Sequence, residues 1–241
     1  MKRTDFTLKP SLIAMLAAAT LLTACGDDND DDTAVVVTPP APVMQTFTVT
    51  VTNLTANQPM SPVILASHAS DAMLWNAGEM ASEALEKMAE GGDTADIAAL
   101  SVINSSVNGT GLLMPGMSET LTLTLDEADV ASISLATMLV NTNDAFTGIN
   151  SYTIAGMEVD ATTAMKFMAY DAGTEANSEA KGTMPGPADG GEGFNASRDD
   201  VDFVHIHPGV ISMYDGLADS VLGASHRFDN PVLAVTIMRT E

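Results

Sequence analysis

The sequence predicts an all-β fold, an antiparallel β-sandwich with a short helical insertion. Several segments alternate apolar and polar residues with a period of two, which is typical of strands with one buried face. Residues 77–90 instead show the period of an amphipathic helix. Turns rich in Gly, Asn and Pro, and a long Asp/Gly-rich loop, favour a sandwich over a barrel.

Residues 1–24 have the pattern of an export signal. Three basic residues precede position 10, and residues 12–22 are almost wholly apolar but too short to span a membrane. The segment ends in Leu-Thr-Ala-Cys, which resembles the bacterial lipobox. We therefore expect Cys25 to be lipidated and to become the first residue of the mature protein, anchoring it to a membrane.

Cys25 is the only cysteine, so the chain can form no internal disulfide. The alternative is an ordinary secretory signal cut at another site, which would leave a reactive thiol exposed in an oxidising compartment. Gly26 follows the cysteine where an acid would signal retention in the inner membrane. This favours an outer-membrane lipoprotein, on either the periplasmic face or the cell surface.

The mature chain is strongly acidic. Cleavage removes three of the nine basic residues and one of the 32 acids. Such a surface repels nucleic acid and anionic headgroups, so we expect no nucleic-acid partner. It attracts cations, although a solvated acidic surface explains the charge equally well.

Residues 25–45 form an acidic and Pro-rich segment that predicts a disordered, extended tether. Residues 46–241 are long enough for one well-buried core, and they are predicted to form a single β-sandwich domain. Strands are expected at residues 46–53, 63–67, 119–125, 131–140, 163–169, 202–206 and 232–239. The helix at 77–90 would be capped by Asn76 and ended by Gly91-Gly92, and a second short helix is expected at 93–100.

Segments in a fixed order along residues 46–240 resemble the bacterial branch of the spondin N-terminal domain family. They begin with TFTVTVTNLT, and the most specific are NDAFTG, YDAGTE and NPVLAVTIMR. The resemblance implies a C2-like antiparallel β-sandwich, in agreement with the periodicity. It also implies an extracellular role in adhesion or ligand binding, towards a protein or glycan surface.

Animal members of the family bind calcium at one end of the sandwich, around two acidic turns. These correspond here to residues 141–146 and 170–175, so the resemblance implies calcium ligands at Asp144, Asp171 and Glu175. Ala145 replaces an aromatic residue of the family pattern, and Glu175 replaces an aspartate. Calcium accepts six to eight oxygen ligands in loose geometry, so Asn177 and Glu179 could compensate. Solvated turn acids are the alternative.

His205 and His207 give the main sign of an enzyme. Strand alternation places both rings on one face, where they could hold a transition metal with His68 or His226. The alternative is a His pair that hydrogen-bonds loop backbone at the sheet rim. We found no Gly-x-Ser-x-Gly elbow or phosphate loop. We therefore expect a non-enzymatic, calcium-binding envelope lipoprotein, with an envelope hydrolase or transition-metal enzyme as the alternative.

Overall fold

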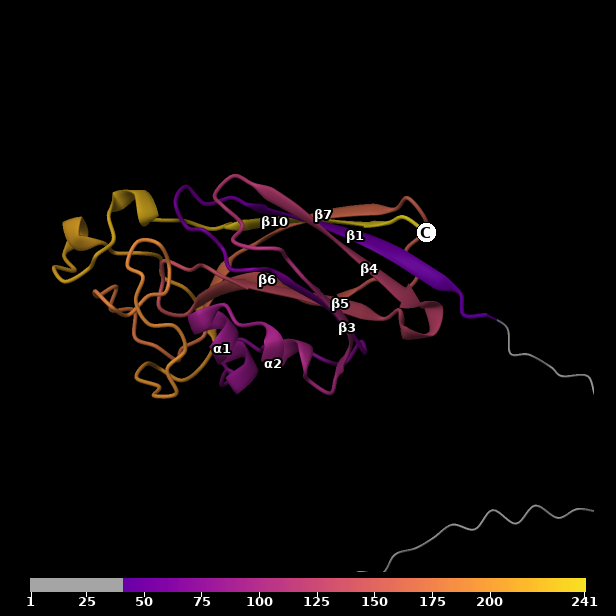
Figure 1. Ribbon diagram of the computed structural model, residues 1–241, viewed down its shortest axis with the longest axis horizontal. Helices are drawn as coiled ribbons and strands as arrows, with labels where there is room; N and C mark the ends of the chain where they lie inside the picture. Colours follow the sequence, from indigo (N-terminus) through magenta and orange to yellow (C-terminus); the bar gives the residue numbers. More distant parts are fainter. Residues whose placement is uncertain (1–40) are drawn as a thin grey trace, which may run out of the picture. The chain divides into compact units, whose positions relative to one another are not determined.

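The computed structural model describes residues 41–241, so the predicted signal peptide, Cys25 and most of the predicted tether lie outside the described residues. The described chain forms two antiparallel sheets (Figure 1). The first has the order β4 (Ser118–Asp126), β1 (Met44–Asn53), β10 (Leu233–Arg239) and β7 (Thr162–Phe167). The second has the order β3 (Ile103–Asn108), β2 (Ile64–His68), β5 (Ser132–Met138), β6 (Ala145–Thr153), β8 (Ala169–Asp171) and β9 (His205–Ile206). The predicted all-β sandwich is confirmed.

The first sheet is built from the alternating segments. Phe47, Val49 and Val51 of β1 are fully buried, and the threonines between them face outward. Across the β1–β4 ladder the outward hydroxyls pair, as in the 2.8 Å contact between Thr50 Oγ1 and Thr120 Oγ1. One apolar and one hydroxyl face therefore explain why these strands were predicted, although β1 begins two residues earlier than expected.

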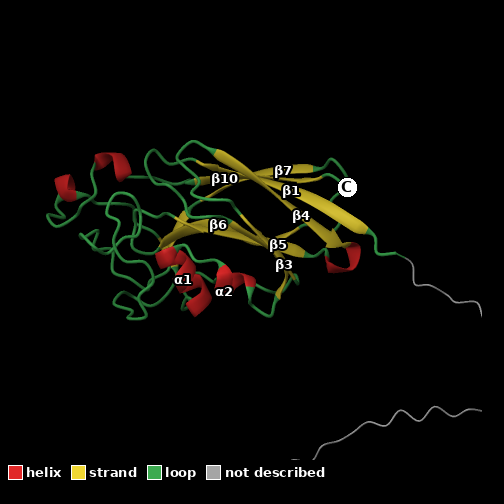
Figure 2. Cartoon of the chain, viewed as in Figure 1, coloured by secondary structure: helices red, strands yellow, loops and turns green. Residues whose placement is uncertain are grey.

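The second sheet is covered on both faces. Leu65, Ile133 and Leu135 pack against the first sheet, whereas Ile64 and Met138 lie in a separate core with the helices. Figure 2 shows the two helices below β5 and β6. Burial on both faces removes the alternation from β2 and β5, whose residues are all buried.

The helical insertion consists of α1 (Glu83–Gly91) and α2 (Ala95–Ala98). The predicted start of the first helix was wrong by six residues, because Ser82 is the N-cap and its hydroxyl accepts from Leu85 N at 3.2 Å. Residues before it are held in an extended loop by backbone hydrogen bonds of Gly78 and Glu79 to Val204. The predicted end is confirmed by Gly92, which has a left-handed conformation.

Other strand predictions need correction. The predicted strand at 163–169 is two strands, since β7 ends in the first sheet and β8 begins in the second. The predicted strand at 202–206 is reduced to the two residues of β9. Strands β3 and β6 were not predicted. The segment 141–146, which the family pattern indicates as a turn, is a turn only up to residue 144, because β6 begins at Ala145.

Long connections gather at one end of the sandwich. Figure 1 shows the loops between β8 and β10, in orange and yellow, at the end opposite the C-terminus. They include two short 3-10 helices, Met213–Asp215 and Ala224–His226; another, Glu127–Asp129, follows β4. Within residues 41–241, no helix has the length and apolar character needed to cross a membrane.

Candidate metal centre

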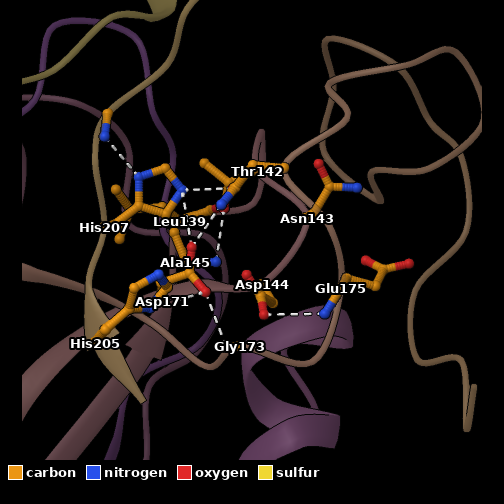
Figure 3. A network of polar contacts seen from close by, with 12 residues as sticks. Leu139, Thr142, Asn143, Asp144, Ala145, Asp171, Gly173, Glu175, His205 and His207 are labelled. Atoms are coloured by element: carbon orange, nitrogen blue, oxygen red, sulfur yellow. Dashed lines mark hydrogen bonds and ion pairs between the residues drawn. The ribbon is translucent and has the colours of Figure 1, made fainter. Parts of the chain in front are cut away.

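Two of the predicted ligands are brought together by strand register. Asp144 immediately precedes β6 and Asp171 ends β8, and these strands pair so that Ala145 lies opposite Asp171. The main chain closes the pair, since Ala172 N donates to Asp144 O at 3.3 Å. Both carboxylates are fully buried, at the loop end of the sandwich (Figure 3).

Asp144 is only half satisfied by hydrogen bonds. Its Oδ2 accepts from Thr174 N at 2.8 Å, from Thr174 Oγ1 at 3.2 Å and from Glu175 N at 3.1 Å. Its Oδ1 is buried and has no partner. Burial, followed by repulsion from Asp171, raises the pKa of Asp144 to about 7, so the charged form is disfavoured unless a cation is near.

Asp171 is fixed by its own turn. Its Oδ1 accepts from Gly173 N at 2.8 Å, and its Oδ2 accepts from Asn177 Nδ2 at 2.6 Å. Gly173 has a φ of 72°, and a Cβ there would collide with Phe203 O, so this turn requires glycine. Burial raises the pKa of Asp171 against the opposing effects of Asn177 and His205.

Glu175 joins the cluster through its main chain. Figure 3 shows Glu175 N bonded to Asp144 while the Glu175 carboxylate points away from it. Its Oε2 is buried without a partner. Burial is the largest cause that raises the pKa of Glu175 to about 8, followed by the nearby charges of Glu90, Asp144 and Asp199.

The proposed substitute ligands behave differently from each other. Asn177 does lie at the cluster, because it bonds to Asp171. Glu179 does not act there: its carboxylate accepts from Ile211 N, Ser212 N and Ser220 Oγ, and so it fastens the C-terminal loops.

Among the described residues, one group of three has potential ligand atoms that all lie within 4.8 Å of one another: Asp171, Asp200 and His205. Asp144 and Glu175 are not members of this group. The side chain of Asp200 was not identified from the sequence, because it lies in a distant loop and resembles the many other acids. The Nδ1 atom of His205 lies 3.4 Å from Asp171 Oδ1.

The two histidines face the same carboxylate, as the alternation predicted (Figure 3). Both ring nitrogens of His207 are already used, since Nε2 contacts Asn177 Oδ1 at 2.9 Å and Nδ1 accepts from Gly209 N at 2.9 Å. Burial lowers the pKa of His207 to about 4, which keeps the ring neutral. His207 therefore has the backbone-bonding role that was the alternative to metal binding.

The other two histidines lie elsewhere. His68 contacts Ser134 Oγ at 2.7 Å within the second sheet, and His226 accepts from Gly223 N at 3.0 Å. Neither belongs to the group formed around Asp171. The structure thus places neither His68 nor His226 where it could be a third ligand beside His205 and His207.

The chemistry of the buried acids fits a cation. In residues 41–241, no lysine or arginine forms an ion pair with Asp144, Asp171 or Glu175. Buried charges need a partner, and two of these carboxylates each keep an oxygen that has none. Carboxylate oxygens held by loops are the ligands that calcium prefers.

Comparison with known families identifies the domain. The model of the spondin N-terminal domain (Spondin_N) matches residues 50–184, a span that includes both acidic turns. A search of curated proteins found no match. The matched span exceeds half of the chain and agrees with the observed sandwich. The chain therefore belongs to the spondin N-terminal domain family.

Proposed function

We propose that this protein is a cell-envelope lipoprotein whose spondin domain binds calcium and serves adhesion or ligand binding rather than catalysis. One observation carries the calcium proposal: Asp144, beside Asp171, and Glu175, whose main chain bonds to Asp144, each keep a buried carboxylate oxygen without a partner. Asp144, Asp171 and Glu175 would hold the ion. Calcium would supply the positive charge that the cluster lacks, and so fix the two turns to each other.

The loop end offers a surface for a partner. Apolar side chains are exposed on β9 and on the loops before and after it, including Phe203, Ile206, Ile211 and Tyr214. Loops positioned by a rigid scaffold commonly carry binding residues. A calcium ion that orders these turns would shape this end for a protein or glycan on another surface.

Calcium dependence is expected to vary with pH. The pKa values of Asp144 and Glu175 in the metal-free fold, about 7 and about 8, exceed their ordinary values of 3.8 and 4.5. Their contribution to stability is therefore complete below pH 4 and is lost as the pH rises towards 8. In chelator, the melting temperature should fall over this range, whereas calcium should restore it at pH 8 and change it little at pH 5.

Thermal melts in calcium and in chelator, at pH 5 and pH 8, test this expectation. Magnesium at the same concentration is the control, because its stricter octahedral geometry fits a loose loop site poorly. Melting temperatures that are equal in calcium and chelator at pH 8 would refute the calcium site.

Lipid anchoring has a separate test. Replacement of Cys25 by serine removes the thiol that would receive the lipid, without altering the described domain. We expect the wild-type protein in the membrane fraction with incorporated labelled palmitate, and the variant without label and outside that fraction. Equal labelling of both proteins would contradict lipidation at Cys25.

A further inference from the structure

A fourth buried carboxylate lies beside the cluster and comes from another part of the chain. Glu90 is the penultimate residue of α1, and its side chain is fully buried. Its Oε2 accepts from Asn195 N at 2.8 Å, whereas its Oε1 is buried and has no partner. Burial raises the pKa of Glu90, and a negative charge near the end of a helix is also unfavourable to the helix dipole, so the charged form of this side chain is costly without a cation.

Glu90 is close enough to the cluster to influence it electrically. Among the charges that raise the pKa of Glu175, Glu90 has the largest effect, ahead of Asp144. Thr174 connects the groups, since its hydroxyl donates to Asp144 and also favours the charged form of Glu90. Thr174 therefore lies close to Asp144 and Glu90 and directly precedes Glu175, and each of these three carboxylates has one buried oxygen without a partner.

A buried glutamate oxygen without a partner is not a general property of α1. Glu86 lies one turn earlier and is also buried, but its Oε2 pairs with Arg198 Nη2 at 2.6 Å. The fold therefore neutralises one buried glutamate of α1 with a guanidinium and leaves the next with a free oxygen.

We propose that Glu90 is a further calcium ligand of the candidate metal centre, so that the helical insertion forms one wall of the site. This inference rests on the proposed function and extends it. The ion would join three segments that are distant in sequence: the end of α1, the turn before β6 and the turn after β8. Through Asn195, which donates to the other Glu90 oxygen, the loop that follows β8 would be held as well.

Calorimetric calcium titration of the full chain, with Glu90→Gln and Glu86→Gln as matched variants, tests the proposal. We expect Glu90→Gln to weaken calcium affinity by at least about tenfold, as the loss of a metal-supporting group does. In chelator, the melting temperature of Glu90→Gln should equal or exceed that of the wild type, because a buried uncompensated charge has been removed. Glu86→Gln should lower the melting temperature equally in calcium and chelator, and it should keep calcium affinity within about threefold.

The outcomes separate the two proposals. A wild-type protein that binds calcium, together with a Glu90→Gln variant of unchanged affinity, would overturn the role of Glu90 and leave the site of Asp144, Asp171 and Glu175 intact. Equal loss of affinity in both variants would also overturn it, because it would indicate damage to α1. A wild-type protein without calcium binding would overturn both. If Glu90→Gln does not fold, Glu90→Asp, which withdraws the carboxylate by one methylene, is expected to show the same loss.

Discussion

Replacement of Asp171 by asparagine is expected to abolish the rise in melting temperature that calcium produces. Asp171 is fully buried between Asp144 and the two histidines, so its charge acts at short range. A ligand present at a thousand times its Kd stabilises a fold by about 4 kcal/mol. For a domain of this size that free energy corresponds to a rise of roughly 10 °C.

Asparagine keeps the shape of the side chain, so the Asp171→Asn variant should still fold and should show the same melting temperature in calcium and chelator. The matched control is Glu158→Gln, which removes an exposed acid in the turn between β6 and β7. This control should keep the full calcium effect. A calcium effect that survives in Asp171→Asn would mean that the ion binds elsewhere.

Truncation of Phe146 to alanine is expected to cost about 3–5 kcal/mol of unfolding free energy. The Phe146 ring is fully buried and meets Trp75 edge-on, with centroids 5.2 Å apart, and stacks on Tyr170 at 5.6 Å. Trp75 precedes the helical insertion and Tyr170 lies in β8. The substitution would therefore open a cavity where the insertion packs on the second sheet.

Urea unfolding of Phe146→Ala measures this loss, with Tyr214→Ala as the control. The Tyr214 side chain is 76% exposed, so its removal should change the free energy by no more than about 0.5 kcal/mol. A loss below about 1 kcal/mol in Phe146→Ala would show that the aromatic cluster does not support the insertion. Since Phe146 lies two residues after Asp144, calcium affinity should weaken in the same variant.

The elements that could be predicted from the sequence have a buried face and an exposed face. Strands β1 and β4 carry this pattern directly, because valine or leucine alternates with threonine. Strand β3 escaped prediction because it is polar and half-exposed at the edge of its sheet. Strand β8 is defined by its pairing with β6, and β9 by its pairing with β8, rather than by a pattern of their own, since two or three residues carry no period.

The helix start shows the limit of local signals. Asn76 with Glu79 has the spacing of a cap, and their side chains do bond at 3.0 Å, but within a turn. Two tertiary hydrogen bonds hold that turn in a non-helical conformation: Gly78 N donates to Val204 O, and Val204 N donates to Glu79 O. Ser82 then caps the helix six residues later than the sequence indicated.

Residues of the candidate site could be predicted from the sequence only at positions that match the family pattern. Asp144 and Asp171 were chosen by resemblance, and the register of β6 and β8 places them side by side. Glu90 and Asp200 could not be found in this way, because acids are abundant and only the packed fold shows which of them are buried or gathered. Burial of a carboxylate is a long-range property.

The direction of β1 determines which end of the domain lies farther from its N-terminus. The described chain begins at residue 41, and the start of β1 lies beside the C-terminal end of β10. At the other end of β1, Asn53 pairs with Leu233, which in turn pairs with Phe167, the last residue of β7. Strand β8 begins shortly after Phe167. Ten extended residues at about 3.3 Å each set the acidic turns roughly 30 Å from the point of entry. In a domain attached through its N-terminus, the end that carries the acidic turns would therefore lie farther from the attachment point, and any pulling force would act first on β1, an inner strand of its sheet.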